Sequence, residues 1–359
     1  MEFLEDQLQK RRKAGLWRCL SSRGRLIDLT SNDYFGFARS IKSITVDQLG
    51  ATGSRLLTGN HPLYRKLEEQ LAAFHRADAC LIYNSGYTAN LGLLAAIGTR
   101  EGTFVHDLEV HASIYDGMRL SHAKCLPFRH NDLDSLTTRL KRASPPVFVL
   151  IESVYSMSGD RALLPEIADL CRLRGAALIV DEAHATGIHG SHGEGLVVEL
   201  GLEAEIFARV HTFSKALGTH GAAVMGSKTL KDYLLNFSRP FIYTTALPPP
   251  TLAMIACAYE KLRKQAKDHQ QRLTQLAQYF RSTAYAKGIA LSANTGPIQP
   301  LYFEDVETVQ RLSKKLQEAG LDVRAIVPPT VSRGKACLRV VLHSFNRKEE
   351  IAQLVELLS

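Results

Sequence analysis

Lys215 has the neighbours that covalent chemistry requires of a lysine. It lies in the segment Thr212-Phe213-Ser214-Lys215-Ala216-Leu217-Gly218, directly after a short apolar run. A lysine that follows a buried strand is poorly solvated, which lowers the pKa of its amine and lets it form a Schiff base with an aldehyde. Lysine is otherwise mostly a surface residue, so Lys215 could also be an ordinary solvent-facing side chain. The residues around it have to decide between a reactive and a solvent-facing lysine.

Asp181 is the expected partner of this lysine. The apolar run at residues 176–180 leads directly into Asp181-Glu182-Ala183-His184. A carboxylate at a strand end can hold the pyridine nitrogen of pyridoxal phosphate protonated, which turns the ring into an electron sink. His184, three residues further on, can reach the phenolic oxygen of the same cofactor.

Three other segments place polar residues at the ends of apolar runs. Ligands of an open parallel sheet bind outside the carboxyl ends of its strands, so such ends are candidates for one common site. The turn from Tyr83 to Asn90 joins a strand to a helix and contains a glycine, which suits a phosphate, although a plain turn explains it almost as well. Glu152 leads to Ser156, and His106 precedes His111, which could stack on a ring or be structural.

The elements that must position these residues alternate between helices and short apolar runs. Runs of this length, bounded by glycine, proline or polar residues, indicate strands that are buried on both faces. The pattern predicts an α/β fold with a mostly parallel central sheet flanked by helices. The predicted strands are 79–83, 103–106, 147–152, 176–181 and 208–212.

The ends of the chain have a different organisation. The first fifteen residues predict an amphipathic helical arm, followed by a short strand at 26–30. Pro248-Pro249-Pro250 precedes a long helical stretch at 251–288, and the remainder alternates strands and helices as a compact α+β unit. We therefore expect an arm at 1–45, a large domain at 46–250 and a smaller domain at 251–359.

The composition is that of an ordinary globular protein of 359 residues, with 45% hydrophobic and 22% charged content. No apolar run is long enough to span a membrane, and Met1 to Gly15 is too charged for a signal peptide, so we expect a cytoplasmic protein. The six cysteines, Cys19 among them, are too far apart for a metal motif and are expected to be reduced and mostly buried. The net charge of +8 fits an anionic substrate; the basic runs lack interleaved aromatics, so no nucleic-acid partner is expected.

Taken together, the motifs resemble those of the α-oxoamine synthase family of fold-type I pyridoxal-phosphate enzymes. The resemblance covers nearly the whole chain and is specific because the order and spacing of the motifs match. Besides the segments quoted above, the matching pieces are Ser31-Asn32-Asp33-Tyr34-Phe35-Gly36, Gly53-Ser54-Arg55, His111-Ala112-Ser113, Glu152 to Asp160, Tyr243-Thr244-Thr245, Pro328-Pro329-Thr330-Val331 and Leu338-Arg339.

The resemblance implies a role for each matching residue. Lys215 would carry pyridoxal 5'-phosphate covalently as an aldimine, Asp181 would pair with the pyridinium, and His111 would stack on the ring. The other implied roles are contacts with the oxygen side of the cofactor (His184, Ser156), phosphate binding (Gly86, Tyr87, Thr212, with Thr245 from a second subunit of a homodimer), binding of the substrate carboxylate (Asn32, Arg339) and an acyl-chain contact (Arg18). The arm that carries Arg18 is shorter than is usual in the family.

The family condenses an amino acid with an acyl thioester and releases carbon dioxide. The substrates we expect here are L-alanine and a pimeloyl thioester on coenzyme A or acyl carrier protein. Glycine C-acetyltransferase and serine palmitoyltransferase activities are the alternatives within the family, followed by 5-aminolevulinate synthase. All of them use the same cofactor residues, so these residues do not discriminate between the substrates.

The sequence also allows two hypotheses from other classes of protein. Asp181, His184, His189 and His192 crowd into twelve residues, which could indicate a metal-dependent hydrolase. That hypothesis gives Lys215 no role and puts its ligands on a glycine-rich loop, which is a poor support for a metal. A non-catalytic binding protein of the same fold would be expected to lack Lys215 or Asp181, and both are present.

Overall fold

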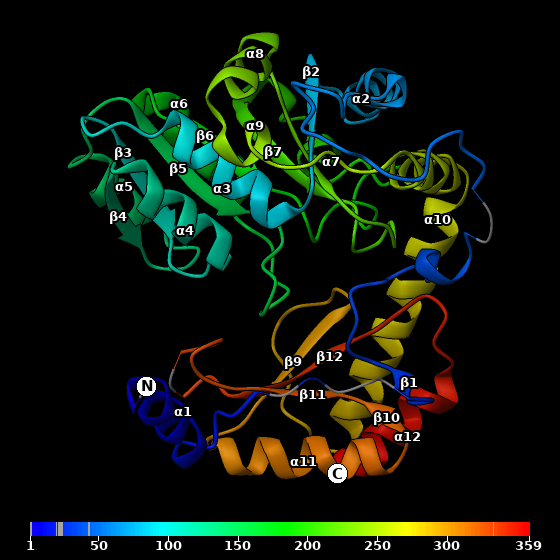
Figure 1. Ribbon diagram of the computed structural model, residues 1–359. Helices are drawn as coiled ribbons and strands as arrows, with labels where there is room; N and C mark the ends of the chain where they lie inside the picture. The colour runs from blue at the N-terminus through cyan, green and yellow to red at the C-terminus, as the bar shows by residue number, and fades with distance from the viewer. Residues whose placement is uncertain (1, 19, 21–23, 42–43, 333) are drawn as a thin grey trace. The chain divides into compact units, whose positions relative to one another are not determined.

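The structure is a computed structural model that describes residues 2–18, 20, 24–41, 44–332 and 334–359. Cys19 therefore lies outside the described residues. The chain divides into two compact units, which are treated separately below (Figure 1). Unit 1 consists of Met1–Ser31, Met157–Gly159 and Leu273–Ser359, and unit 2 of Asn32–Ser156 and Asp160–Arg272.

Unit 2 is built on a seven-stranded sheet. Its strands are β2 (Ala79–Tyr83), β3 (Thr103–Asp107), β4 (Lys124–Phe128), β5 (Val147–Glu152), β6 (Ala177–Asp181), β7 (Ile206–Thr212) and β8 (Ala222–Gly226). Their order is β2-β8-β7-β6-β5-β3-β4; β8 runs antiparallel to both neighbours, and the other neighbouring pairs are parallel. The predicted α/β fold with a mostly parallel sheet is confirmed.

Helices cover both faces of this sheet. They are α2 (Pro62–Phe74), α3 (Gly86–Ile97), α4 (Ala112–Ser121), α5 (Leu133–Leu140), α6 (Leu164–Arg174), α7 (Leu196–Glu199), α8 (Lys228–Phe237), α9 (Arg239–Ile242) and the first part of α10 (Pro249–Ala286), with 3-10 turns η1 (Phe37–Arg39) and η2 (Glu203–Glu205). One face packs against α3, α4, α8 and α9 in one apolar cluster, and the other against α5, α6 and α7 in a second. Burial on both faces explains why the strands appear in the sequence as continuous apolar runs.

Two strands, β4 and β8, were not predicted. β4 is an edge strand whose first residues, Lys124 and Cys125, are exposed, so it lacks the apolar signal of a buried strand. The short Ala-rich run of β8 follows a glycine-rich turn and gains its strand conformation by pairing between β2 and β7. In both cases tertiary pairing outweighs a weak local preference.

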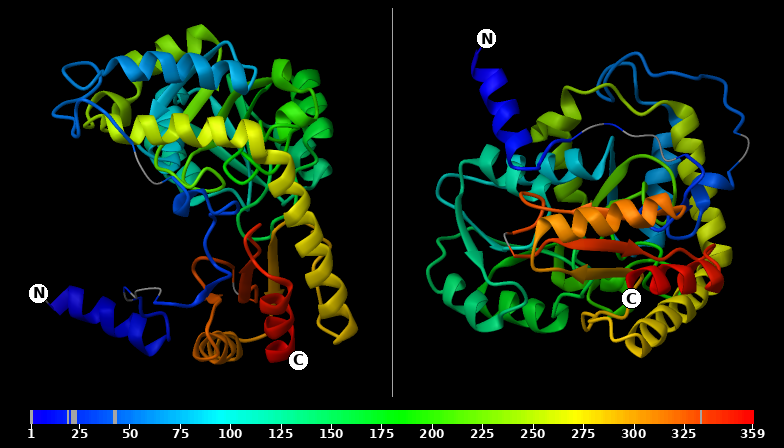
Figure 2. Two further views of the ribbon diagram at one scale, coloured as in Figure 1. Left: turned by 90° about the vertical axis from the view of Figure 1, so that its right-hand side faces the viewer. Right: turned by 90° about the horizontal axis from the view of Figure 1, so that it is seen from below.

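Unit 1 contains a three-stranded antiparallel sheet of order β11-β12-β9 and a separate parallel pair, β1-β10. The strands are β1 (Ile27–Asp28), β9 (Ile298–Tyr302), β10 (Leu321–Asp322), β11 (Arg324–Ile326) and β12 (Cys337–Val341); the helices are α1 (Glu2–Lys13), α11 (Val306–Glu318), α12 (Lys348–Leu358) and the end of α10. Side chains of α10, α11, α12 and β12 share one core. The predicted α+β character of the C-terminal part is confirmed, and Figure 2 shows these elements from two further directions.

The helical arm predicted for the N-terminus is present as α1, in which no residue is buried. Across the part of the chain that the structure describes, no helix is long and apolar enough to cross a membrane. The described cysteines are free: Cys80, Cys171 and Cys337 are buried, whereas Cys125 and Cys257 are exposed.

Candidate active site

The carboxyl edge of the unit 2 sheet brings several predicted residues together. Glu152 ends β5 and lies opposite Asp181, which ends β6 and in turn lies opposite Val210 of β7. Thr212 ends β7, and Lys215 follows three residues later. Because these strands are parallel, their polar ends share one edge, as the sequence pattern predicted.

Asp181 is held in place from two sides. Its Oδ2 accepts a hydrogen bond of 2.7 Å from Nδ2 of Asn90 in α3, and its Oδ1 accepts one of 2.9 Å from the amide of Ala183. Asn90 is itself anchored, because its Nδ2 also lies 3.0 Å from Oγ of Ser113 in α4. The carboxylate is buried, so these donors fix its orientation without competition from water. No role was predicted for Asn90, although it closes the motif 83–90.

Lys215 shares its surroundings with Asp181. The side chain of Lys215 is half-buried, and both groups act electrostatically on His111 and on Glu152. Desolvation lowers the pKa of His111, Lys215 acts in the same direction and Asp181 opposes it. The four residues therefore form one electrostatic cluster.

His111 begins α4 as its N-cap residue. Its Nδ1 accepts a hydrogen bond from the Ser113 amide at 3.2 Å and lies 2.7 Å from Oγ of Ser113. An imidazole that accepts at Nδ1 and has a lowered pKa is neutral, with its proton on Nε2. The capping bonds fix the ring of His111, which remains solvent-accessible and can therefore face a planar ligand.

Glu152 is a buried carboxyl in the same cluster. Its Oε2 accepts from the amide of Ser156 at 3.1 Å, while its Oε1 has no hydrogen-bond partner in the described structure. Burial, followed by the charge of Asp181, raises the pKa of Glu152 to about 8. Glu152 is therefore mostly a neutral acid at pH 7, and the bond to Ser156 ties the position of that serine to it.

The start of α3 forms a cradle next to the end of β7. Ser85 caps the helix by accepting from the amide of Thr88, and the amides of the first helical turn, which include those of Gly86 and Tyr87, have no partner within a helix. A Cβ at Gly86 would collide with the methyl group of Thr212. Oγ1 of Thr212 is buried and has no partner in the described structure. An anion with several acceptor oxygens fits this combination of donors.

His184 and Ser156 complete the predicted cofactor contacts in unit 2. Nδ1 of His184 lies 2.7 Å from the hydroxyl of Tyr34, and both side chains are buried. Sequence reasoning gave Tyr34 no role, although it lies within the matching motif 31–36. The hydroxyl of Tyr87 contacts Asp116, and the ring of Tyr87 lies edge-on to that of His111, with centroids 6.3 Å apart.

The remaining predicted residues lie elsewhere in the two units. In unit 2, Thr245 is exposed and its carbonyl accepts from Nδ2 of Asn84 at 2.9 Å, and Asn32 is half-buried. Arg339 and Arg18 belong to unit 1, where Arg339 lies on β12 and Nη2 of Arg18 donates to Oγ1 of Thr330 at 3.3 Å.

The residues of the metal hypothesis do not converge. His189 pairs with Glu199 at 3.2 Å and His192 with Glu194 at 3.0 Å. Among the described residues, no group of three or more His, Cys, Asp or Glu side chains could hold a metal ion.

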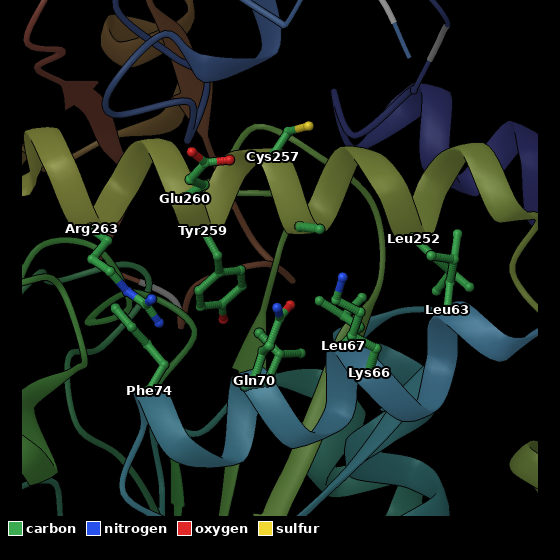
Figure 3. A pocket seen from close by; sticks show the side chains of 12 residues that line it. Leu63, Lys66, Leu67, Gln70, Phe74, Leu252, Cys257, Tyr259, Glu260 and Arg263 are labelled. Carbon is green, nitrogen blue, oxygen red and sulfur yellow. The ribbon is translucent and has the colours of Figure 1, made fainter. Parts of the chain in front are cut away.

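A separate pocket of unit 2 lies between α2 and α10, where Leu67, Tyr259 and Arg263 contribute to its lining (Figure 3). None of the predicted site residues lines it.

Pyridoxal phosphate fits the geometry of the cluster. The cradle at Gly86 and Thr212 matches a phosphate, the fixed carboxylate of Asp181 matches a pyridinium nitrogen, and Lys215 supplies an amine for an aldehyde. The mostly parallel sheet, with a lysine, a fixed carboxylate and a phosphate cradle at its carboxyl edge, places the protein in the fold-type I class of pyridoxal-phosphate transferases.

Comparisons with known proteins agree with this class. The family model described as aminotransferase class I and II matches residues 25–358, and the chain belongs to this family. Proteins named 8-amino-7-oxononanoate synthase from Marinobacter nauticus and Emericella nidulans are 37% and 39% identical; the matches cover 100% and 92% of this chain and 96% and 88% of theirs.

Two solved structures extend the comparison to the fold. A serine palmitoyltransferase variant from S. paucimobilis with a bound PLP–myriocin aldimine is 28% identical, with a TM-score of 0.88, and the match covers 99% of this chain and 95% of that chain. The 8-amino-7-oxononanoate synthase from Francisella tularensis is 29% identical, with a TM-score of 0.80 over 92% of this chain and 96% of that chain. These neighbours bear out the resemblance to α-oxoamine synthases.

Proposed function

We propose that the protein binds pyridoxal phosphate at the carboxyl edge of the unit 2 sheet and condenses L-alanine with a pimeloyl thioester. The products would be 8-amino-7-oxononanoate, carbon dioxide and a free thiol, which is a step of biotin biosynthesis. The observation that carries the proposal is the fixed carboxylate of Asp181 in one electrostatic cluster with Lys215. The names of the curated relatives support the choice of substrates.

In this proposal each residue has a defined task. When bound, pyridoxal phosphate supplies an electron-accepting ring next to the Cα of the substrate. The carboxylate of Asp181 would accept a hydrogen bond from the protonated pyridine nitrogen and so keep it protonated, and the neutral ring of His111 would cover one face. The remaining contacts would come from residues on the oxygen side (His184, Ser156) and around the phosphate (Gly86, Tyr87, Thr212, and Thr245 of a second subunit).

Lys215 would act as the base of the reaction. Its amine, freed once the substrate is bound, takes the Cα proton of alanine, and Cα then forms a bond to the acyl carbon as the thioester C–S bond breaks. The thiolate leaves and takes up a proton, the bond to the carboxylate carbon breaks to release carbon dioxide, and a proton returns to Cα. We assign the substrate carboxylate to Asn32 and Arg339, because a guanidinium group matches a planar anion, and the acyl chain to Arg18.

The proposal also covers the setting of the reaction. A homodimer with shared sites, a donor thiol of coenzyme A or acyl carrier protein, and a cytoplasmic location all stay predictions. A second candidate, palmitoyl transfer to L-serine, is favoured by the TM-score of 0.88 to a serine palmitoyltransferase, at an identity of 28%. The higher identity of the curated relatives, 37% and 39%, favours the first candidate.

Product analysis tests both candidates together. Purified protein with pyridoxal phosphate is offered alanine, glycine or serine with pimeloyl-, acetyl-, succinyl- or palmitoyl-coenzyme A, with Lys215→Ala as the control. Turnover of alanine with the pimeloyl thioester, lost in the variant, is the expected result. Another productive pair would move the protein within its family, and activity that survives without Lys215 would refute the mechanism.

A further inference from the structure

A fully buried polar network lies behind the candidate site. Glu182 directly follows Asp181, which ends β6. His211 directly precedes Thr212 on the neighbouring strand, β7. The side chains of Glu182 and His211 are completely buried, and no task has been given to either of them so far. His75, at the end of α2, packs its ring against that of His211 with centroids 3.9 Å apart.

The hydrogen bonds determine which nitrogen of each histidine carries the proton. Oγ1 of Thr186 donates its one proton to the carbonyl of Glu182 at 2.8 Å, so its contact of 2.9 Å with Nδ1 of His211 requires the histidine to be the donor. Nδ1 of His75 likewise donates to the carbonyl of Glu194 at 2.6 Å. Its Nε2 therefore accepts from the hydroxyl of Tyr259 at 2.9 Å, and Figure 3 shows Tyr259 projecting from α10 toward α2.

This assignment leaves two buried atoms facing each other. Nε2 of His211 and Oε2 of Glu182 are 4.0 Å apart, and neither has a hydrogen-bond partner in the described structure. Oε1 of the same carboxyl is satisfied, because it accepts from the amides of Leu196 at 2.9 Å and Val197 at 3.2 Å. If Glu182 were ionised and His211 neutral, two acceptors would face each other without a donor, which is costly in a dry interior.

We propose that Glu182 at pH 6 is a neutral carboxylic acid whose proton on Oε2 is directed at Nε2 of His211, and that this pair positions the strand ends that carry Asp181 and Thr212. A proton on Oε2 makes one of the two facing atoms a donor, so that a donor and an acceptor face each other across 4.0 Å in place of two acceptors. Glu182 and His211 are thus positioning residues, since they act through their chain neighbours and not on a ligand. The role as positioning residues rests on the proposed cofactor site, whereas the protonation state does not.

The surrounding charges decide which atom carries the proton. Placed on His211, the proton would create a buried cation next to His75 and Arg209, and burial together with these two neighbours lowers the pKa of His211 far below its usual value. Placed on Glu182, it creates no charge. Burial raises the pKa of Glu182 to about 7, although Arg209 on β7, the amides of α7 and Ser153 on the neighbouring loop act in the opposite direction.

Infrared spectroscopy tests the protonation state directly. We expect the holoprotein at pH 6 to show an absorption band of a protonated carboxyl that is absent from Glu182→Gln. Glu152→Gln is the matched control, because Glu152 is the other buried acid with a raised pKa near the site and should remove a separate band. If Glu182→Gln removes no such band, the carboxyl is ionised and the proposal fails.

Cofactor affinity tests the role as positioning residues. Glu182→Gln keeps an acceptor for the two amides and a donor for His211, so its dissociation constant for pyridoxal phosphate should stay within about twofold of the wild type. Glu182→Leu keeps the volume but removes both functions, and it should weaken binding by about tenfold or more. Equal weakening in both variants, or no weakening in Glu182→Leu, would refute the role.

Thermal unfolding distinguishes a neutral Glu182 from an ionised Glu182 that stabilises the fold through its charge. Glu68→Gln is the matched control, because Glu68 is a buried carboxylate that is paired with Arg55 and Lys231. We expect Glu68→Gln to lower Tm by at least about 5 °C and Glu182→Gln to lower it by less than about 2 °C. A similar loss in both variants would show that Glu182 is ionised. None of these three measurements depends on the substrate, so a failure of the proposed reaction would leave them unchanged.

Discussion

Replacement of Asn90 by alanine tests how far the site depends on the orientation of Asp181. The variant removes the hydrogen bond of 2.7 Å to Oδ2 of Asp181 and the contact with Ser113. A hydrogen bond to a charged group contributes about 1.5–3 kcal/mol. At about 1.4 kcal/mol for each factor of ten, this free energy corresponds to a loss of about 10- to 150-fold in the affinity for pyridoxal phosphate or in kcat. The amide of Ala183 still holds Oδ1, so we expect the lower half of this range.

The assay is a titration of the apoprotein with pyridoxal phosphate, followed by its absorbance, together with steady-state kinetics of the holoprotein. The control is Asn236→Ala, since the exposed Asn236 on α8 donates to the carbonyl of Asp232 at 2.8 Å, within its own helix and not to the site. The control should behave like the wild type. If Asn90→Ala retains both wild-type affinity and wild-type kcat, the orientation of Asp181 is not set by Asn90 and our reasoning about the site is wrong.

Two further predictions concern the edges of the site. Burial acts to lower the pKa of His130, but bonds to Asp107 at 3.0 Å and Asp160 at 2.9 Å raise it to about 10. The pKa of His130 in the unfolded chain is near 6.5. The two bonds of protonated His130 to the carboxylates therefore stabilise the fold fully below pH 6.5, and this contribution is lost as the pH rises through about 10. His130→Gln should therefore lower Tm by about 5 °C or more at pH 6 but little above pH 10, and a constant difference would contradict the assignment. Gly86→Ala should weaken the binding of pyridoxal phosphate by about tenfold, because the added Cβ meets the methyl group of Thr212. Adding Thr212→Ser, which removes that methyl group, should restore part of the loss. Wild-type affinity in Gly86→Ala would refute the cradle.

Several features of the fold follow from sequence alone. The buried strands β2, β3, β5, β6 and β7 are apolar runs whose ends are marked by polar residues, and α10 shows as a long helical stretch next to three prolines, the last two of which belong to the helix. The edge strand β4 and the antiparallel β8 carry no such signal, because their conformation comes from pairing with neighbours. The division of the chain into an arm and two domains at residues 46 and 251 stays a prediction.

For the site, the sequence determined the residue types and the tertiary structure decided their partners. Asp181 and Lys215 can be found because each follows a buried run, and parallel strands end at one edge of a sheet. The support from Asn90 cannot be found in this way, because its contact with Asp181 spans ninety-one positions and requires α3 to pack on the sheet. The same holds for the proton that we propose between Glu182 and His211, because its place depends on hydrogen bonds and charges from other elements. Local patterns encode which side chains are available, whereas charge states and orientations depend on burial and on neighbours that only the folded chain supplies.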